Sequence, residues 1–125
     1  MNKKPVIAIV DDDLSAREGI VDLVSSMGFE ARAFERAEDF LRSHEIARAD
    51  CLITDVRMPG MNGLELLDRL LAAGKSIPAI VLTAFTQEAD RVRAFGAGAV
   101  CYMPKPFHES ELMKCIGVAL SSGRL

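Results

Sequence analysis

The sequence lacks several features that would each assign it to a particular class of protein. No apolar run approaches the roughly 20 residues that a membrane-spanning helix needs, and residues 1–5 have neither the apolar segment nor the cleavage site of a signal peptide. The net charge is −3, so the chain has no positive excess with which to bind a nucleic-acid backbone. We therefore expect a cytoplasmic protein whose chain binds neither a membrane nor a nucleic acid.

Cysteine and histidine are also scarce. The three cysteines, Cys51, Cys101 and Cys115, are odd in number and have no C-x-x-C spacing. Because cysteines in a reducing compartment are usually small, buried hydrophobic side chains, we expect neither a disulfide nor a zinc site. His44 and His108 are far apart in the sequence and are expected at the surface or at helix caps.

The residues that are present indicate one α/β domain spanning residues 1–125. Five short apolar runs are predicted to be strands, at 6–10, 30–34, 51–55, 79–83 and 99–103. Segments with helical spacing of apolar residues follow each run, ending with a helix at 109–120. This (βα)5 pattern predicts a doubly wound parallel sheet in the order 2-1-3-4-5, with the more polar second strand at an edge.

Several details of the helices can also be predicted. Ser15 begins a sequence with the form of a capping box, and Thr86 is placed to cap the fourth helix. In that helix, residues at helical spacing indicate the apolar face, namely Ala89, Val92 and Phe95.

Polar residues follow the predicted strands where each strand ends. Asp11 and Asp12 follow the first strand, Asp55 ends the third, Thr83 ends the fourth and Lys105 follows the fifth. These residues should meet at one edge of the sheet, where two like charges ~4 Å apart repel by about 4 kcal/mol at an effective dielectric near 20. Lys105 supplies one positive charge, which is too little, so a hard divalent cation such as Mg²⁺ is expected.

A carboxylate beside Mg²⁺, a lysine and a hydroxyl can attack phosphorus to form an aspartyl phosphate. Two other functions fit less well. A flavin-mononucleotide carrier needs a phosphate-binding loop after the first strand, where the acids at 11–13 would repel the phosphate. A phosphatase of the haloacid-dehalogenase type needs a second aspartate two residues after the nucleophile, and Arg57 occupies that position.

With these motifs in place, the sequence resembles the CheY-like receiver domains of two-component response regulators over essentially its whole length. The motifs that carry the resemblance are Asp11-Asp12, Asp55 with Met58-Pro59-Gly60, Thr83-Ala84 and Lys105-Pro106-Phe107. Residues 55–67, together with the last motif, are similar to the nitrogen-fixation-regulator subgroup.

The resemblance implies a role for each acidic residue. It implies that Asp55 is the phosphoacceptor and that Asp11 and Asp12 bind Mg²⁺, for which Mn²⁺ can substitute. The backbone carbonyl of Arg57 would be a further metal ligand. Asp13 has no clear metal role, and complementing the charge at a helix start is its simpler interpretation.

The resemblance also assigns the remaining site residues. It implies that Thr83 and Lys105 contact the phosphoryl group, that Tyr102 is the switch aromatic, and that the Lys105-Pro106 bond is cis. Phe85, in the loop after the fourth strand, is expected to be exposed, as either a partner contact or a loop anchor.

The partners follow from the same resemblance. A histidine kinase would phosphorylate the domain, and the helix 4–strand 5–helix 5 face would bind an output domain, a target protein or a second copy in a phosphorylation-dependent homodimer. The chain would be no enzyme beyond catalysing its own phosphorylation and dephosphorylation. A degenerate receiver that binds partners without phosphorylation is the alternative. Residues 121–125 resemble the start of a linker, so the chain is either a receiver excised from a helix-turn-helix transcription regulator or a stand-alone one.

Overall fold

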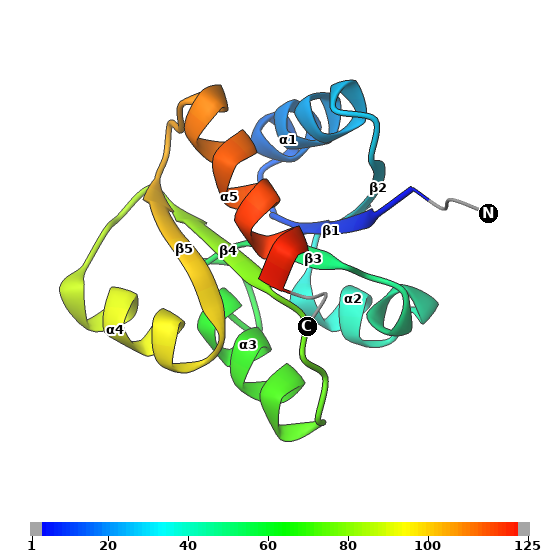
Figure 1. Ribbon diagram of the computed structural model, residues 1–125. Helices are drawn as coiled ribbons and strands as arrows, with labels where there is room; N and C mark the ends of the chain where they lie inside the picture. Colours follow the sequence, from blue (N-terminus) through cyan, green and yellow to red (C-terminus); the bar gives the residue numbers. More distant parts are fainter. Residues whose placement is uncertain (1–3, 123–125) are drawn as a thin grey trace.

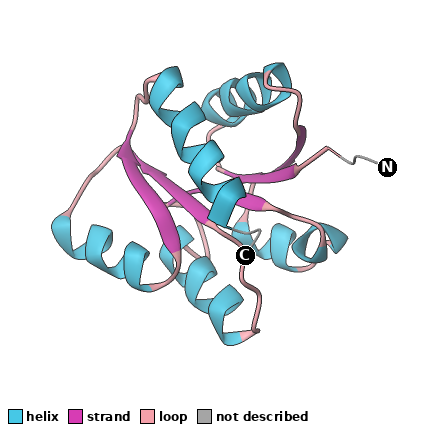
Figure 2. Ribbon diagram, in the orientation of Figure 1, coloured by secondary structure: helices cyan, strands magenta, loops and turns pink. Residues whose placement is uncertain are grey.

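The computed structural model describes residues 4–122, which form alternating strands and helices (Figures 1 and 2). The strands are β1 (Val6–Val10), β2 (Glu30–Phe34), β3 (Cys51–Asp55), β4 (Ala79–Thr83) and β5 (Ala99–Pro104). The helices are α1 (Leu14–Ser26), α2 (Ala37–Leu41), α3 (Gly63–Ala72), α4 (Glu88–Gly96) and α5 (Glu109–Ser122), with a 3-10 turn η1 (His44–Ala47) after α2. The predicted strands are confirmed to within one residue, whereas η1 was not predicted.

The five strands form one parallel sheet in the order β2-β1-β3-β4-β5, as predicted. At the carboxyl ends, Val10 pairs with Thr54, and Asp55 pairs with Leu82. Because neighbouring strands end at nearly the same level, the residues at and just beyond their ends share one edge of the sheet. Among the described residues, no helix is long and apolar enough to cross a membrane.

Helices cover both faces of the sheet: α1 and α5 lie on one face, and α2, α3 and α4 lie on the other (Figure 1). Alternate strand residues therefore enter two separate cores. Ala8, Leu52 and Val81 pack toward α2 and α3, whereas Ile9 and Ile53 pack toward α1 and α5. This double burial explains why β1, β3 and β4 are continuous apolar runs rather than alternating ones.

Two predicted helix caps are wrong. Asp13, not Ser15, caps α1: its backbone is extended, and its carboxylate accepts a hydrogen bond from the Ala16 amide at 2.8 Å. The cap position of α4 belongs to Gln87, whose side chain makes no capping hydrogen bond, so Thr86 has no capping role. Both errors arise because several polar residues precede each helix and the sequence does not show which one leaves the helical conformation.

The predicted apolar face of α4 lies on the solvent side. Val92 is 59% exposed and Phe95 is 42% exposed, while Ala94 is the buried residue of this helix. Periodicity shows that a helix has an apolar stripe but does not show whether the sheet covers it. An exposed apolar stripe remains on α4, beside β5.

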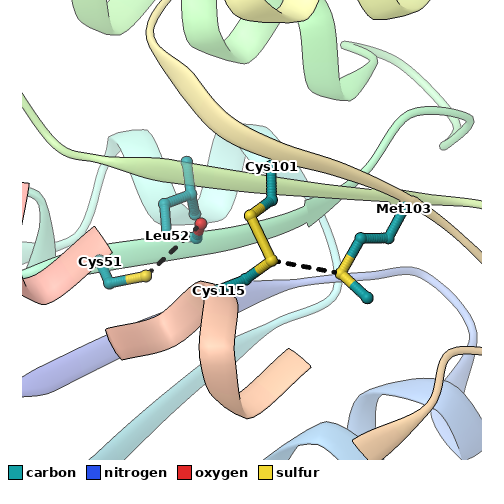
Figure 3. Close-up of a disulfide and its surroundings, with 5 residues drawn as sticks. All are labelled: Cys51, Leu52, Cys101, Met103 and Cys115. Carbon is teal, nitrogen blue, oxygen red and sulfur yellow. Dashed lines mark hydrogen bonds between the residues drawn. A yellow bond between two sulfur atoms is a disulfide. The ribbon is translucent and has the colours of Figure 1, made fainter. Parts of the chain in front are cut away.

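The expectation of no disulfide is wrong for one pair of cysteines. Cys101 in β5 is bonded to Cys115 in α5, with their Cα atoms 6.2 Å apart (Figure 3). The two residues are 14 positions apart in sequence, but the chain reverses after β5, so α5 packs back against this strand. Cys51 is free and buried, as expected.

The last residues were expected to resemble the start of a linker. Residues 121 and 122 belong to α5, and residues 123–125 lie outside the described residues, so the expected linker stays a prediction.

Candidate functional site

The predicted site residues meet at the carboxyl edge of the sheet. Asp11 directly follows β1, Asp55 is the last residue of β3, and Thr83 is the last residue of β4. Lys105 follows β5, where its backbone amide donates to the Thr83 carbonyl at 2.9 Å. Each of these four strands therefore delivers one polar side chain to a shared edge.

The carboxylates of Asp11, Asp12 and Asp55 form an acidic cluster in which one oxygen of each lies within 4.8 Å of the others. Asp11 is 1% exposed and Asp55 is 8% exposed, while Asp12 is half-buried. In a solvated turn, water would screen the repulsion between these carboxylates. Because two of the three are buried, their mutual repulsion is screened less and is therefore stronger.

Lys105 lies between two of these carboxylates. Its Nζ donates to Asp11 Oδ2 at 2.8 Å and to Asp55 Oδ2 at 3.1 Å. Three carboxylates and one ammonium nevertheless leave two negative charges at this edge. The geometry thus brings together the acidic cluster and the lysine that the sequence placed there.

The protonation of Asp55 reflects this environment. Burial raises the pKa of the Asp55 carboxyl; Lys105 opposes the rise, and the neighbouring Asp11 adds to it. Burial alone would lower the pKa of the Lys105 ammonium, but its hydrogen bond to Asp11 and the charges of both aspartates raise that pKa overall. The lysine therefore stays charged at neutral pH.

Backbone groups fix the orientation of the two buried carboxylates. Asp55 Oδ1 accepts a hydrogen bond from the Val56 amide at 2.7 Å, and Asp11 Oδ1 accepts one from the Asp13 amide at 2.9 Å. The Arg17 guanidinium donates to the backbone carbonyl of Asp11 at 2.8 Å, rather than to its carboxylate. Each buried carboxylate thus has one oxygen on a backbone amide and the other on Lys105.

The hydroxyl groups of Thr83 and Tyr102 are bonded to backbone groups. Thr83 Oγ1 accepts from the Phe85 amide at 3.1 Å and donates to the Phe85 carbonyl at 3.2 Å. The Tyr102 hydroxyl accepts from the Gln87 amide at 3.1 Å and donates to the Gln87 carbonyl at 3.3 Å. The Thr83 hydroxyl therefore stabilises the loop after β4, and the Tyr102 hydroxyl is hydrogen-bonded to the backbone at the start of α4.

Arg57 and Phe85 make a contact that the sequence did not reveal. Each stands two residues beyond the end of its strand, and the Arg57 guanidinium lies 5.7 Å from the centre of the Phe85 ring. Phe85 is 65% exposed, as expected. The contact links the loop after β3 to the loop after β4. The equal offsets from adjacent strand ends were the available signal.

Gly63 is a further residue that sequence reasoning missed. It is the first residue of α3, and its amide donates to the Val56 carbonyl at 2.8 Å. A Cβ at this position would overlap the Asp55 carbonyl oxygen and lie 3.1 Å from Thr54 Oγ1. The absent side chain lets α3 approach the end of β3 closely.

The loop between β3 and α3 is also held from α2. One Glu38 oxygen accepts a hydrogen bond from the Met61 amide at 3.1 Å, and Gly60 adopts a positive φ of 76° beside it. Glu38 lies 17 positions before Asp55, so no local pattern could have assigned it to this loop.

The acidic cluster fits a hard divalent cation. One oxygen of each of the three carboxylates lies within 4.8 Å of the others, and the two uncompensated negative charges favour a doubly charged ion over a second lysine. Mg²⁺ is the ion typically held by a few carboxylates together with a phosphate and water.

Comparison with known proteins finds a matching family and similar regulators. Residues 7–117 match a family described as the response regulator receiver domain. The chain is 38% identical over 119 residues to the response regulator protein TmoT of Ectopseudomonas mendocina, covering 95% of this chain and 54% of TmoT. It is 34% identical over 120 residues to the transcriptional regulatory protein FixJ of Bradyrhizobium diazoefficiens, covering 96% and 58%. The chain spans about half the length of the curated relatives it matches.

Solved structures share the same architecture. The response regulator StyR superposes with a TM-score of 0.90 at 41% identity, covering 97% of this chain and 61% of that one. The structure of FixJ-N superposes with a TM-score of 0.85 at 32% identity, covering 96% of both chains.

Proposed function

Because this chain belongs to the response regulator receiver domain family of two-component signalling, we propose that Asp55 accepts a phosphoryl group from the phosphohistidine of a sensor kinase. The observation that carries the proposal is the position of Lys105, whose Nζ lies 3.1 Å from Asp55 Oδ2. An orienting cation beside a buried carboxylate is what an aspartate needs to attack a negatively charged phosphoryl group.

In the proposed step, one Asp55 oxygen attacks phosphorus while the bond from phosphorus to the imidazole nitrogen breaks. The new bond joins phosphorus to that oxygen, and the imidazole nitrogen keeps the electron pair. Lys105 would neutralise charge on the transferred group. The Thr83 hydroxyl would become a second donor once it leaves the Phe85 backbone.

Asp11, Asp12 and Asp55 would hold Mg²⁺, with the Arg57 carbonyl as a further ligand and Mn²⁺ as a substitute. When bound, the ion supplies the positive charge that the phosphoryl oxygens require. The support for this assignment is the charge imbalance at the cluster, which Lys105 alone does not remove.

The same proposal extends to signalling through α4, β5 and α5. Movement of Thr83 toward the phosphoryl group would open space for Tyr102, whose release from Gln87 would shift a pre-existing equilibrium at this face. Inverting a 1:99 population needs about 5.5 kcal/mol of differential stabilisation. Exposed Val92 and Phe95 make the face suitable for an output domain, a target protein or a second receiver.

For the whole protein, we propose one receiver domain, residues 1–125, that controls an output such as transcription. The curated relatives extend well beyond the matched region, and FixJ and NtrC are named as transcriptional regulators. On this proposal, the chain catalyses its own phosphorylation and dephosphorylation and no other reaction.

The first test is labelling with acetyl phosphate in the presence and absence of Mg²⁺. We expect label on the wild type with Mg²⁺ and none after EDTA or in Asp55→Asn. Asp13→Asn is the matched control, because it removes an adjacent charge while asparagine still caps α1. Labelling that survives in Asp55→Asn would refute the mechanism, and a wild type that never labels would favour the degenerate receiver.

The second test follows the switch. Adding beryllofluoride, a phosphoryl mimic, should shift the backbone amide resonances of α4 and β5, and also that of Gln87 at the start of α4. Resonances that stay in place while those around Asp55 move would contradict signalling through this face.

A further inference from the structure

The Cys101–Cys115 bond closes a loop that contains two of the proposed site residues. Tyr102 directly follows the first cysteine, and Lys105 lies between the two. Figure 3 shows the bond joining β5 to α5, with the sulfur of Met103 beside that of Cys115 at 3.7 Å. The phosphorylation chemistry described above makes no use of this bond.

Both bonded cysteines are accessible from solvent. They are half-buried and line a surface hollow of about 500 Å³, which they share with Phe95, Tyr102 and Lys114. Thiol–disulfide exchange requires a thiolate to reach one of the two sulfurs, and accessible disulfides are the labile ones. Cys51 contrasts with the pair, because it is 0% exposed and burial, with a smaller effect of Asp50, raises the pKa of its thiol to about 12.

We propose that Cys101 and Cys115 form a reversible redox site on the folded protein, and that its oxidised state holds Lys105 in the position that phosphorylation of Asp55 requires. The electron donor is a dithiol, and the acceptor that restores the bond is another disulfide. The regulatory part of this inference rests on the proposed function, whereas the exchange chemistry does not.

The reaction balances as a two-electron exchange. A thiolate of the dithiol attacks one sulfur, forms a mixed disulfide and displaces the other cysteine as a thiolate, which takes up a proton. The second thiol of the donor then attacks the mixed disulfide and releases the remaining cysteine. The donor leaves as a cyclic disulfide, and the domain retains two thiols.

The loop geometry links this exchange to the site. With the bond closed, the segment that carries Lys105 is tied to β5 at one end and to α5 at the other. Opening the bond removes the covalent tie between β5 and α5 and leaves the segment held by packing and hydrogen bonds alone, so local opening is easier and Lys105 would spend less time between Asp11 and Asp55. A catalytic cation that must be repositioned for each transfer contributes less to rate than one already in place.

The exchange is tested by counting reactive thiols on the folded protein. Maleimide should add to none of the cysteines in the oxidised protein and to Cys101 and Cys115 after dithiothreitol, with Cys51 reacting only in denaturant. In Cys115→Ser, Cys101 should react without reductant. In the wild type, a pair that dithiothreitol opens only in denaturant would overturn the proposal, as would Cys101 and Cys115 that react with maleimide before any reductant is added.

The coupling is tested by the rate of acetyl phosphate labelling in the oxidised and reduced wild type. Reduction should lower the rate and speed the hydrogen exchange of the Lys105 amide, which is bonded to the Thr83 carbonyl. Cys115→Ser should match the reduced protein in either condition, and Cys51→Ala should respond as the wild type does. Equal rates in both states would overturn the coupling, whereas no labelling in either state would refute the proposed function and leave the thiol count unchanged.

Discussion

Replacing Gly63 with alanine tests how closely α3 must approach the proposed phosphorylation site. The added Cβ would overlap the Asp55 carbonyl oxygen, lie 2.9 Å from the Asp55 carbonyl carbon and lie 3.1 Å from Thr54 Oγ1. Two of these three atoms belong to the backbone of β3, which is paired with strands on both sides. Relief therefore requires α3 to move away from the sheet.

This overlap should lower the free energy of unfolding. Overpacking of a tightly packed interior typically costs about 1–3 kcal/mol, and a contact with backbone atoms belongs at the upper end, near ~3 kcal/mol. For a domain of this size 1 kcal/mol corresponds to roughly 4 °C in Tm, so a decrease of roughly 12 °C is expected. Displacing α3 should also shift Asp55, because the Gly63 amide donates a hydrogen bond to the carbonyl of Val56, the residue that follows Asp55.

The assay is urea unfolding of Gly63→Ala beside Gly19→Ala, followed by acetyl phosphate labelling of both variants. Gly19 lies inside α1, where an added Cβ would meet no atom within 4 Å, so alanine there should stabilise by about 0.5–1 kcal/mol. Labelling should fall for the first variant and persist for the second. A Gly63→Ala protein as stable and as readily labelled as the wild type would refute the close-approach argument.

Three further predictions concern charge and the disulfide. Mg²⁺ at about 100 times its Kd should raise the free energy of unfolding by about 2.7 kcal/mol, and Asp12→Asn should reduce that gain in a calorimetric titration. Because the pKa of Asp55 is raised, its contribution to stability is fully present below the ordinary carboxyl pKa and is lost as the pH rises through the raised value. In EDTA, Asp55→Asn should therefore be more stable than the wild type at neutral pH, with a margin that shrinks on acidification; a margin independent of pH would contradict this. Reducing Cys101–Cys115 should lower the free energy of unfolding in urea by about 3 kcal/mol, the value for a loop of about 15 residues, and Cys115→Ser should show no such change.

The sequence predicted the strands and their order because burial on both faces leaves a simple pattern. Runs such as residues 6–10 and 79–83 are apolar without alternation, and the polar residue that ends each run marks the carboxyl edge. The meeting of Asp11, Asp55 and Lys105 followed from that order, since a parallel sheet brings these strand ends together.

The remaining features depend on geometry that a linear pattern does not contain. The periodicity of α4 showed an apolar stripe but not that Val92 would face solvent, because the direction of a helix face is set by packing. The Cys101–Cys115 pair depends on how α5 returns along β5. The hydroxyl of Thr83 is hydrogen-bonded to the Phe85 backbone in the loop that follows it, and the sequence does not determine which rotamer a threonine adopts.

The two unbalanced charges at the acidic cluster also bear on how this protein would respond to selection in the laboratory. A library screened for heat resistance alone would favour replacing Asp55 with an uncharged residue, because burial and the neighbouring Asp11 charge disfavour its ionised form. The most heat-resistant descendants would then keep the sheet and lose the proposed phosphoacceptor. Engineering a more heat-resistant form of this domain therefore requires a screen that measures acetyl phosphate labelling as well as stability.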